Sequence, residues 1–304
     1  MEAARVLLLA HPAGHSLSPL MHGAAFRALG LNATYEAVDV APADLAAAVA
    51  RLAEPPFLGA NVTVPHKEAV APLMNELTPA AQAVGAVNTI VRRDHRLVGH
   101  NTDGEGFLRA LSELAPFAAL QPADAGRGAA PDLTGRTCLV LGAGGAARAV
   151  VHSLLAAGAA VKVLNRNEAR AARLVEDLQR VDADERRLTV CAASDLPAQL
   201  SHIDLLVNST SVGMSGGPEP ESLPLLEGSQ LALLPPAAVV VDLVYRPALT
   251  PLLRAASQRG LVVQNGLPML VWQGALAFEA WTGSAAPVEV MREAAERGLA
   301  GRPA

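Results

Sequence analysis

Short apolar runs typical of β-strands alternate along this chain with Ala- and Leu-rich stretches typical of helices. In the first part of the chain the expected order is strand Val6–Leu9, helix Leu20–Leu29, strand Thr34–Val38, helix Leu45–Leu52 and strand Gly59–Val64. Further strands are expected later, at Thr137–Leu141, Val161–Leu164, Leu205–Asn208, Val239–Leu243 and Leu261–Gln264. This alternation predicts an α/β architecture in which each series of strands forms an open, mostly parallel sheet.

The two series indicate two domains. The chain has 304 residues, which is enough for one large or two medium domains. Residues 116–131, which separate the series, are rich in Pro, Gly, Ala and Asp and are expected to form a loop before the second domain. A helical stretch from Met269 to Trp281, continuing to Arg297, follows the second series and need not pack on it.

Composition favours a globular protein that acts on small molecules. Apolar residues make up 51% of the chain and charged residues 17%, which allows a buried core and disfavours disorder. Aromatic residues make up only 3%, so the core must consist mainly of Ala, Val and Leu. The net charge of −5 argues against a basic surface for nucleic acid. It leaves room for an anionic substrate, because the local charge of a site decides that.

Nothing in the sequence predicts a membrane or secreted protein. No apolar run reaches the roughly 18 residues that a bilayer-spanning helix needs. The first apolar run ends at His11 and Pro12 and is expected to be a strand and not a signal segment. The two cysteines, Cys138 and Cys191, give no disulfide framework and are expected to be reduced. We therefore expect a cytoplasmic protein.

The strongest local signal is Gly142-Ala-Gly144-Gly-Ala-Ala147, which follows an apolar strand and leads straight into a helix. In this context G-x-G-x-x-A is typical of dinucleotide-binding domains. Gly142 permits a tight turn, Gly144 lets the backbone approach a pyrophosphate, and Ala147 allows close helix–strand packing. The amides at the start of the helix would then face the phosphates.

The choice of cofactor is expected at the end of the next strand, where the sequence reads Asn165-Arg166-Asn167-Glu168-Ala-Arg170. Arg166 suits a 2′-phosphate, and Arg170 lies one helical turn further on. Glu168 is expected to be a first-turn helix acid that points to solvent. The charge of Arg166 favours NADP over NAD, because an acid at this place would repel the phosphate.

Three earlier segments place polar residues where a strand passes into a helix. The first contains Ser16, Ser18 and Pro19. Pro19 fits the first helical position, which makes Ser18 a candidate N-cap. Capping alone can explain Ser18 but not Ser16. Two hydroxyl groups at the positive end of a helix form a candidate carboxylate site.

The second segment reads Asn61-Val-Thr63-Val-Pro65-His-Lys67, and Pro65 is expected to open a helix with Lys67 in its first turn. A helix start lowers the pKa of an amine, which suits an acid/base group. The alternative is a surface lysine that swings away.

The third segment contains Asn88 and, after the next strand, Thr102-Asp103-Gly-Glu105. Thr102 and Glu105 fit a capping box, which would make Asp103 an ordinary first-turn acid. Alternatively, Asp103 meets Lys67 at the carboxyl edge of the sheet, where open α/β proteins bind their ligands.

Taken in order and spacing, these segments resemble the signature of the shikimate dehydrogenase family. The matching residues in the first half are Ser16-x-Ser18-Pro19, Asn61-Val-Thr63-x-Pro65-x-Lys67, Gly85-Ala-Val-Asn88-Thr89 and Asn101-Thr-Asp103-Gly104. Those in the second half are the Gly142 loop, Asn165-Arg166, Asn208-Ser-Thr210-Ser-Val-Gly213-Met214, Asp242-Leu-Val-Tyr245 and Asn265-Gly266-Leu-Pro-Met269-Leu-Val-Trp-Gln273. Asn167 stands where the family commonly has Thr.

The resemblance implies reversible NADPH-dependent reduction of 3-dehydroshikimate to shikimate, with Lys67 and Asp103 as the catalytic pair. It implies that Ser16, Ser18 and Tyr245 hold the substrate carboxylate. Ring hydroxyl groups would be bound by Asn61, Thr63, Asn88, Asp103 and Gln273. NADP(H) would be contacted by Gly142, Ala143, Gly144, Gly145, Ala146, Asn165, Arg166, Asn167, Arg170, Thr210, Val244, Gly266 and Met269.

The family also implies a discontinuous substrate domain, residues 1–103 with 267–304, into which an NADP domain, residues 104–266, is inserted. The expected assembly is a monomer or homodimer, without nucleic-acid or membrane partners.

Other functions fit less well. A quinate/shikimate dehydrogenase that uses NAD is disfavoured by Arg166, and a folate methylene dehydrogenase would lack the paired serines. A non-catalytic NADP-binding sensor would have lost Lys67 or Asp103. A zinc enzyme is disfavoured because Pro12 and Gly14 prevent the helix that would bring His11 and His15 together.

Overall fold

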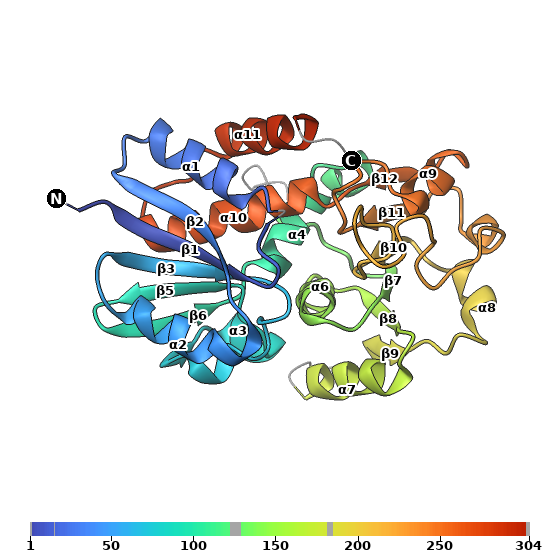
Figure 1. Cartoon of the computed structure of the whole chain (residues 1–304). Helices are drawn as coiled ribbons and strands as arrows, with labels where there is room; N and C mark the ends of the chain where they lie inside the picture. Colours follow the sequence, from blue (N-terminus) through green and yellow to red (C-terminus); the bar gives the residue numbers. More distant parts are fainter. Residues whose placement is uncertain (1, 15, 122–128, 181–184, 302–304) are drawn as a thin grey trace. The chain divides into compact units, whose positions relative to one another are not determined.

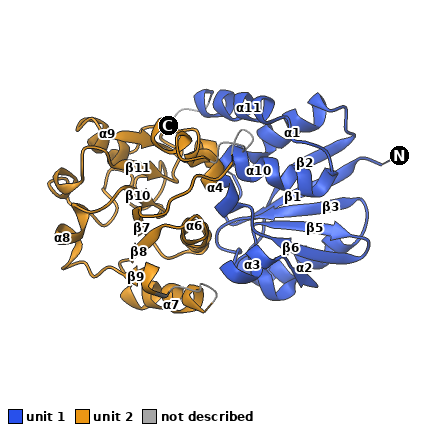
Figure 2. Cartoon of the chain, turned by 180° about the vertical axis from the view of Figure 1, so that it is seen from behind, with its two compact units in different colours: residues 1–106, 270–303 blue, residues 107–269, 304 orange. Residues whose placement is uncertain are grey.

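Each predicted series of strands forms a six-stranded sheet of its own (Figure 1). The computed structural model describes residues 2–14, 16–121, 129–180 and 185–301. The chain divides into two compact units, residues 1–106 with 270–303 and residues 107–269 with 304 (Figure 2). The predicted α/β class is confirmed, with sheet A in the first unit and sheet B in the second.

Sheet A has the strand order β2-β1-β3-β5-β6-β4. Its strands are β1 (Ala4–Ala10), β2 (Ala33–Asp39), β3 (Phe57–Val62), β4 (Glu76–Leu77), β5 (Thr89–Arg93) and β6 (Arg96–His100). The helices of this unit are α1 (Ser18–Ala28), η1 (Pro42–Asp44), α2 (Leu45–Ala50), η2 (Arg51–Ala53), η3 (Ala71–Leu73), α3 (Pro79–Val84) and α11 (Val288–Ala300), together with parts of α4 and α10.

Sheet A is mixed, because β5 runs antiparallel to β3 and to β6. The strands β5 and β6 form a hairpin that the sequence did not predict. Asp94 in its tight turn has a φ of 55°, a conformation that Asp tolerates better than most residues. The third strand also ends earlier than predicted, at Val62, because the Thr63 carbonyl accepts a hydrogen bond from the His66 amide at 2.8 Å and so closes a turn.

Sheet B has the order β12-β11-β10-β7-β8-β9, and its strands all pair in parallel. Its strands are β7 (Thr137–Leu141), β8 (Ala160–Leu164), β9 (Leu188–Val190), β10 (Leu205–Asn208), β11 (Val239–Asp242) and β12 (Val262–Gln264). Its helices are α5 (Ala115–Ala118), α6 (Gly145–Ala156), α7 (Glu168–Gln179), η4 (Glu185–Arg187), α8 (Leu196–Leu200), η5 (Gln230–Leu233) and α9 (Pro251–Ser257). This strand order is that of doubly wound dinucleotide-binding domains, and it reverses between β7 and β10.

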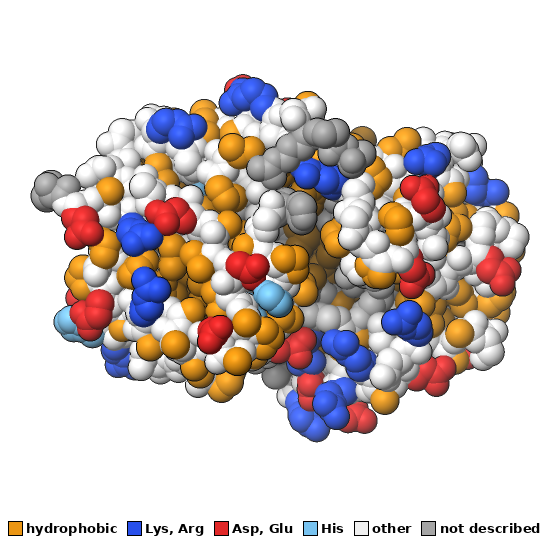
Figure 3. Space-filling view, in the orientation of Figure 1, with side chains coloured by type: hydrophobic (Ala, Val, Ile, Leu, Met, Phe, Trp, Pro, Cys, Tyr) orange, Lys and Arg blue, Asp and Glu red, His pale blue; other side chains and the backbone are white. Residues whose placement is uncertain are grey.

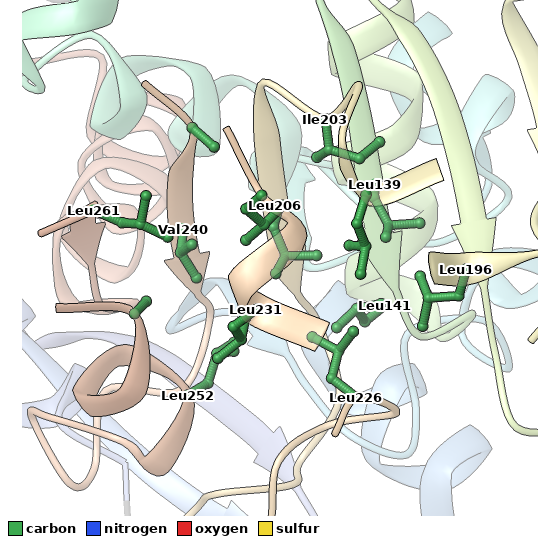
Figure 4. Packing of buried hydrophobic residues seen from close by; sticks show 14 of the residues in the cluster. Leu139, Leu141, Leu196, Ile203, Leu206, Leu226, Leu231, Val240, Leu252 and Leu261 are labelled. Carbon is green, nitrogen blue, oxygen red and sulfur yellow. The ribbon is translucent and has the colours of Figure 1, made fainter. Parts of the chain in front are cut away.

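Aliphatic side chains form both cores, as the low aromatic content requires. In sheet B, Leu139, Leu206 and Val240 come from neighbouring strands and pack with Leu231 and Leu252 (Figure 4). In sheet A, a corresponding cluster covers the face under α2. Since the core strands of sheet B are buried along almost their whole length, they are nearly continuous apolar runs, which is why the sequence located them well.

The chain passes from one unit to the other inside α4 (Asp103–Leu111) and again inside α10 (Leu267–Thr282). Within the second unit, Gln264 Nε2 at the end of β12 donates a hydrogen bond to the Ala110 carbonyl of α4 at 3.0 Å. Within the first unit, α11 packs against α1. The predicted final helical stretch is therefore two helices.

Three other expectations concern small parts of the chain. Residues 122–128 of the predicted loop, and His15, lie outside the described residues. Cys138 and Cys191 are buried free thiols. Among the described residues, no helix is both long and apolar enough to cross a bilayer, and no cluster of His, Cys, Asp and Glu could hold a metal ion.

Candidate active site

The two candidate carboxylate ligands, Ser16 and Ser18, lie in the loop before α1 and at the first position of α1. Ser16 Oγ accepts a hydrogen bond from the Ser18 amide at 3.1 Å, and α1 begins at Ser18 with Leu17 as its N-cap. The prediction that Ser18 caps the helix is therefore wrong. Because Ser16 satisfies the first amide, the Ser18 hydroxyl group takes no part in capping, although the residue is only 5% exposed.

Lys67 and Asp103 form a buried ion pair. Lys67 Nζ donates to Asp103 Oδ2 at 2.5 Å, and the two side chains are 14% and 6% exposed. Lys67 comes from the loop after β3, whereas Asp103 is the first residue of α4, just after β6. Water screens such a pair weakly, so the two charges interact strongly. Asp103 is thus not a first-turn acid that faces solvent.

The segment that carries Lys67 is a series of turns and not the predicted helix. The Lys67 carbonyl accepts from the Val87 amide at 2.8 Å, so it does not accept the helical hydrogen bond from Ala71. His66 anchors the same turn, because its Nε2 lies 2.8 Å from the Val40 carbonyl oxygen and the ring is buried. These long-range contacts override the local signal of the proline. Lys67 therefore does not lie at a helix start.

Asn88 holds Asp103 from the side opposite to Lys67. Asn88 Nδ2 donates to Asp103 Oδ1 at 2.9 Å and lies 3.3 Å from Gln273 Oε1. Asn88 Oδ1 accepts from the Thr102 amide at 2.9 Å, and Thr102 Oγ1 donates to the Gln273 carbonyl at 3.0 Å. This network joins three predicted site residues, Asn88, Asp103 and Gln273, to Thr102, which precedes Asp103 in the chain. The Asn88 amide group already forms hydrogen bonds with Thr102, Asp103 and Gln273. We infer that the main role of Asn88 is to hold Asp103 in place.

Asn61 and Thr63 lie at the carboxyl end of β3. Asn61 is 5% exposed and its Oδ1 accepts a hydrogen bond from the Tyr35 hydroxyl group at 2.7 Å. Its Nδ2 donates to the Asn88 carbonyl and to Thr89 Oγ1, each at 3.1 Å. Thr63 is half-buried in the following turn. Sequence reasoning missed Tyr35, because a single aromatic residue on a strand belongs to no motif.

The loop between β7 and α6 has the shape that a dinucleotide needs. Gly142 has a φ of 109°, and a Cβ there would lie 2.5 Å from Ser209 Oγ, so only glycine fits. A Cβ on Gly144 would meet nothing within 4 Å, so the backbone there is open to a ligand. No side chain caps α6, which leaves the first-turn amides of Gly145 and Ala146 uncapped. This loop lies where the strand order of sheet B reverses.

Exposed basic residues follow β8. The Arg166 side chain is 87% exposed, and its Nη1 lies 3.7 Å from Glu219 Oε1, an ion pair that solvent screens. Asn167 is the N-cap of α7 and accepts from the Arg170 amide at 3.2 Å, while Asn165 Nδ2 donates to the Asn167 carbonyl at 2.9 Å. The two asparagines shape the turn and leave the arginines exposed. Basic side chains gather over α7 in Figure 3.

A buried polar network follows β10 and β11. Asp242 Oδ1 accepts from Asn208 Nδ2 at 2.9 Å and from the Val244 amide at 3.0 Å, and its Oδ2 accepts from Thr250 Oγ1 at 2.6 Å. Burial raises the pKa of Asp242 to about 6, although these hydrogen bonds act against the shift. Thr210 Oγ1 donates to Asn208 Oδ1 at 2.7 Å. The network thus fixes Thr210 and Val244, two candidate cofactor contacts.

The remaining candidates lie around the start of α10. A Cβ on Gly266 would lie 1.9 Å from the Leu243 carbonyl oxygen, so this position requires glycine. Met269 is buried. Tyr245 is half-buried and belongs to the second unit, whereas the two serines belong to the first. Their joint contact with a substrate carboxylate stays a prediction.

Comparison with known proteins gives a consistent result along the chain. Residues 8–90 match the family model of the shikimate dehydrogenase substrate-binding domain. Residues 125–214 match shikimate / quinate 5-dehydrogenase, and residues 266–296 match the shikimate 5′-dehydrogenase C-terminal domain.

Similar full-length proteins point the same way. The chain is 47% identical to the shikimate dehydrogenase (NADP⁺) of Symbiobacterium thermophilum, over 97% of this chain and 95% of that protein. It is 45% identical to that of Methanopyrus kandleri, over 94% and 93%. The crystal structure of shikimate 5-dehydrogenase from Thermus thermophilus, in complex with NADP(H) and shikimate, is similar with a TM-score of 0.81 and 40% identity. The match covers 97% of this chain and 100% of that one.

Proposed function

The chain belongs to the shikimate dehydrogenase family, and from that membership we propose that it catalyses the reversible NADPH-dependent reduction of 3-dehydroshikimate to shikimate. The reaction is a step toward chorismate and the aromatic amino acids. The observation that carries the proposal is the buried Lys67–Asp103 pair, 2.5 Å apart, because a ketone reductase needs a proton donor held beside its substrate.

We assign substrate binding to the first unit, together with Tyr245 from the second. Ser16, Ser18 and Tyr245 bind the substrate carboxylate through their hydroxyl groups. The ring hydroxyl groups are bound by Asn61, Thr63, Asn88, Asp103 and Gln273. The position of Asn61 near the end of β3, of Lys67 in the loop after β3 and of Asp103 just after β6 supports this assignment, since these side chains meet in one hydrogen-bonded network.

We assign NADP(H) to the second unit. The open backbone at Gly144 and the uncapped start of α6 fit a pyrophosphate. Arg166 and Arg170 fit the 2′-phosphate, because both are exposed and Arg166 can exchange its screened contact with Glu219 for a phosphate.

In this mechanism the protein supplies a proton and an electrostatic environment. When bound, NADPH supplies the hydride for the ketone carbon. Lys67 Nζ donates a proton to the carbonyl oxygen as negative charge develops there, and its own positive charge stabilises that oxygen. Asp103 orients the Lys67 amine through its Oδ2, and Asn88 fixes the second oxygen of Asp103. In the reverse direction, the neutral amine of Lys67 accepts the proton.

A spectrophotometric assay of NADPH or NADH formation tests the function. The purified protein is given shikimate or quinate, each with NADP⁺ or NAD⁺, and kcat/KM is compared across the four combinations. We expect shikimate with NADP⁺ to give the highest value. A higher value with quinate or NAD⁺ would favour the quinate/shikimate alternative, and no turnover with any pair would favour a non-catalytic NADP-binding sensor.

We further propose that the protein works in the cytoplasm as a monomer or homodimer, with its small-molecule substrate as partner and without nucleic acid. Size-exclusion chromatography with light scattering distinguishes the two assemblies.

A further inference from the structure

A buried tyrosine stands behind the candidate substrate site. Tyr35 lies on β2 and is 7% exposed. Its hydroxyl group donates to Asn61 Oδ1 at 2.7 Å, which is a short and well-formed hydrogen bond between two buried groups. Neither the sequence motifs nor the proposed mechanism uses this residue.

The ring of Tyr35 is held by two aromatic neighbours. His22 stacks on it with the ring centres 4.4 Å apart and the planes within 12°, and Trp281 lies across it at 6.2 Å. Trp281 is itself fixed by a hydrogen bond from its Nε1 to the Ile90 carbonyl at 2.9 Å. Burial lowers the pKa of His22 to about 3, so its ring is neutral and acts by packing. The hydroxyl group of Tyr35 therefore has little freedom to leave Asn61.

The hydrogen bonds of Asn61 determine what its amide group can offer a substrate. Both Nδ2 protons are used, by the Asn88 carbonyl and by Thr89 Oγ1. Oδ1 has two lone pairs and receives one proton, from Tyr35. A flip of the amide would place Oδ1 against the Asn88 carbonyl oxygen, which is unfavourable. Among the residues that the structure describes, Oδ1 has no second donor, so Asn61 can offer a ligand one lone pair but no proton.

Tyr35 also contacts α1, the helix that begins at the candidate carboxylate ligand Ser18. Burial raises the pKa of Tyr35 well above its ordinary value, and the neighbouring Ser18 side chain acts against this shift. Ser18 and His22 are four residues apart on α1 and so share one face of the helix. One phenol group therefore contacts side chains from α1 and from β3.

We propose that Tyr35 is a positioning residue that, together with the Asn88 carbonyl and Thr89 Oγ1, fixes Asn61 as a hydrogen-bond acceptor, so that the ring hydroxyl group bound by Asn61 must donate a proton. This inference rests on the proposed function, in which Asn61 binds shikimate. The ligand class that fits is a polyol whose hydroxyl group at this position is free, and an ether or a fluorine there cannot make the contact.

The first experiment is Tyr35→Phe, which keeps the ring stack and removes only the hydroxyl group. We expect KM for shikimate to rise about tenfold with kcat and KM for NADP⁺ little changed, because one hydrogen bond to a buried amide is lost. The variant is repeated in an Asn61→Ala background, where Tyr35→Phe should have no further effect on KM. Thr282→Val is the matched control, since it removes a hydroxyl group that bonds the Phe278 carbonyl within α10 and should leave KM unchanged.

An equal rise in KM in both backgrounds would overturn the inference, and so would an unchanged KM in Tyr35→Phe when Asn61→Ala raises it. A second measurement uses the unaltered enzyme and does not depend on the folding of a variant. The ring hydroxyl group that Asn61 binds is identified first. It is the one whose removal in a deoxy analogue of shikimate weakens binding to the unaltered enzyme but not to Asn61→Ala. A fluoro analogue is then tested at that ring position. The fluoro analogue accepts but cannot donate, so we expect it to bind no better than the deoxy analogue.

Binding of the fluoro analogue as tight as that of shikimate would contradict the inference. Failure of the proposed function has a different signature, which is that the unaltered protein does not turn over shikimate with NADP⁺ at all. In that case both proposals fall.

Discussion

The two units prepare their candidate sites in opposite ways. In the first unit the polar groups already bond one another: Lys67, Asp103 and Asn88 form a chain of contacts between 2.5 and 2.9 Å with little exposure to water. In the second unit, the groups assigned to the cofactor are bare backbone at Gly144 and an arginine that is 87% exposed.

This difference shows which unit holds its site residues in fixed positions before a ligand binds. The chemical step needs an amine and a carboxylate in fixed positions, and preorganised groups do not have to reorganise during the reaction. The cofactor, by contrast, carries its own charges and can order an exposed arginine on binding. We therefore expect changes at the Lys67–Asp103 pair to affect kcat, and changes at the groups assigned to the cofactor to affect KM for NADP⁺.

The largest expected effect comes from Lys67→Ala, which removes the proton donor. We expect kcat for shikimate oxidation to fall by a factor of about 10² to 10⁴ while KM changes little. Lys162, the only other lysine of the chain, gives the matched control Lys162→Ala, which should retain activity. If KM rises and kcat stays intact, Lys67 is a binding residue and the mechanism fails.

The next largest effect concerns Asp242, a buried acid in the second unit. The pKa of Asp242 is raised to about 6 in the folded protein, above its ordinary value of 3.8, so folding favours the protonated form. Its contribution to stability is fully present below about pH 4 and is lost as the pH rises through about 6. Asp242→Asn removes this titration.

We therefore compare the free energy of local unfolding of Asp242→Asn with that of the unaltered protein. The difference, variant minus unaltered protein, should rise by about 3 kcal/mol between about pH 4 and about pH 7 and then stay constant. Hydrogen exchange of the β10 and β11 amides measures it, and the flat region above that range serves as the internal control. A difference that does not vary with pH would show that the Asp242 carboxyl group has an ordinary pKa.

A smaller effect is expected from Arg166→Ala. Loss of one charged hydrogen-bond donor should raise KM for NADP⁺ about 10- to 100-fold and leave KM for NAD⁺ nearly unchanged, because NAD⁺ lacks the 2′-phosphate. Arg173→Ala, which removes an exposed arginine of the following helix α7, is the control. An equal loss for both nucleotides would place Arg166 outside the 2′-phosphate site.

The smallest effect should come from Gly144→Ala. Its backbone has a φ of −96°, which alanine adopts without strain, and a Cβ would meet no protein atom within 4 Å. The melting temperature should stay unchanged while KM for NADP⁺ rises several-fold, because the methyl group occupies space that the pyrophosphate needs. Gly142→Ala provides the contrast, since its Cβ would collide with Ser209 and destabilise the unit. A normal KM in Gly144→Ala would argue against a pyrophosphate there.

How much the sequence could predict also differs between the units. Each core strand of sheet B is one nearly continuous apolar run, so its position follows from local composition, and the glycine loop has a motif of its own. In sheet A, Arg92 and Arg93 interrupt the apolar pattern of β5, and the hairpin was missed. The sequence suggested that Lys67 and Asp103 meet, but the expected helix around Lys67 was wrong because Val87, distant in sequence, takes its carbonyl.

The residues that support the site were the hardest to foresee. Tyr35 and His22 act through stacking and through one hydrogen bond across strands, and neither contact leaves a pattern in neighbouring residues. A local rule can place a cap or a turn. It cannot show which side chain lies behind an amide.

The passage of the chain through α4 and α10 has a consequence for synthesis on the ribosome. Residues 107–269 of the second unit are contiguous and its strands are complete once β12 has emerged, so it can fold at that point. The first unit must wait, because Phe278 and Trp281, which cover Phe26 and His22, are translated more than two hundred residues later. During that interval the nascent first unit exposes the apolar face of α1. A chaperone that covers this face until α10 and α11 arrive would protect the newborn chain from aggregation.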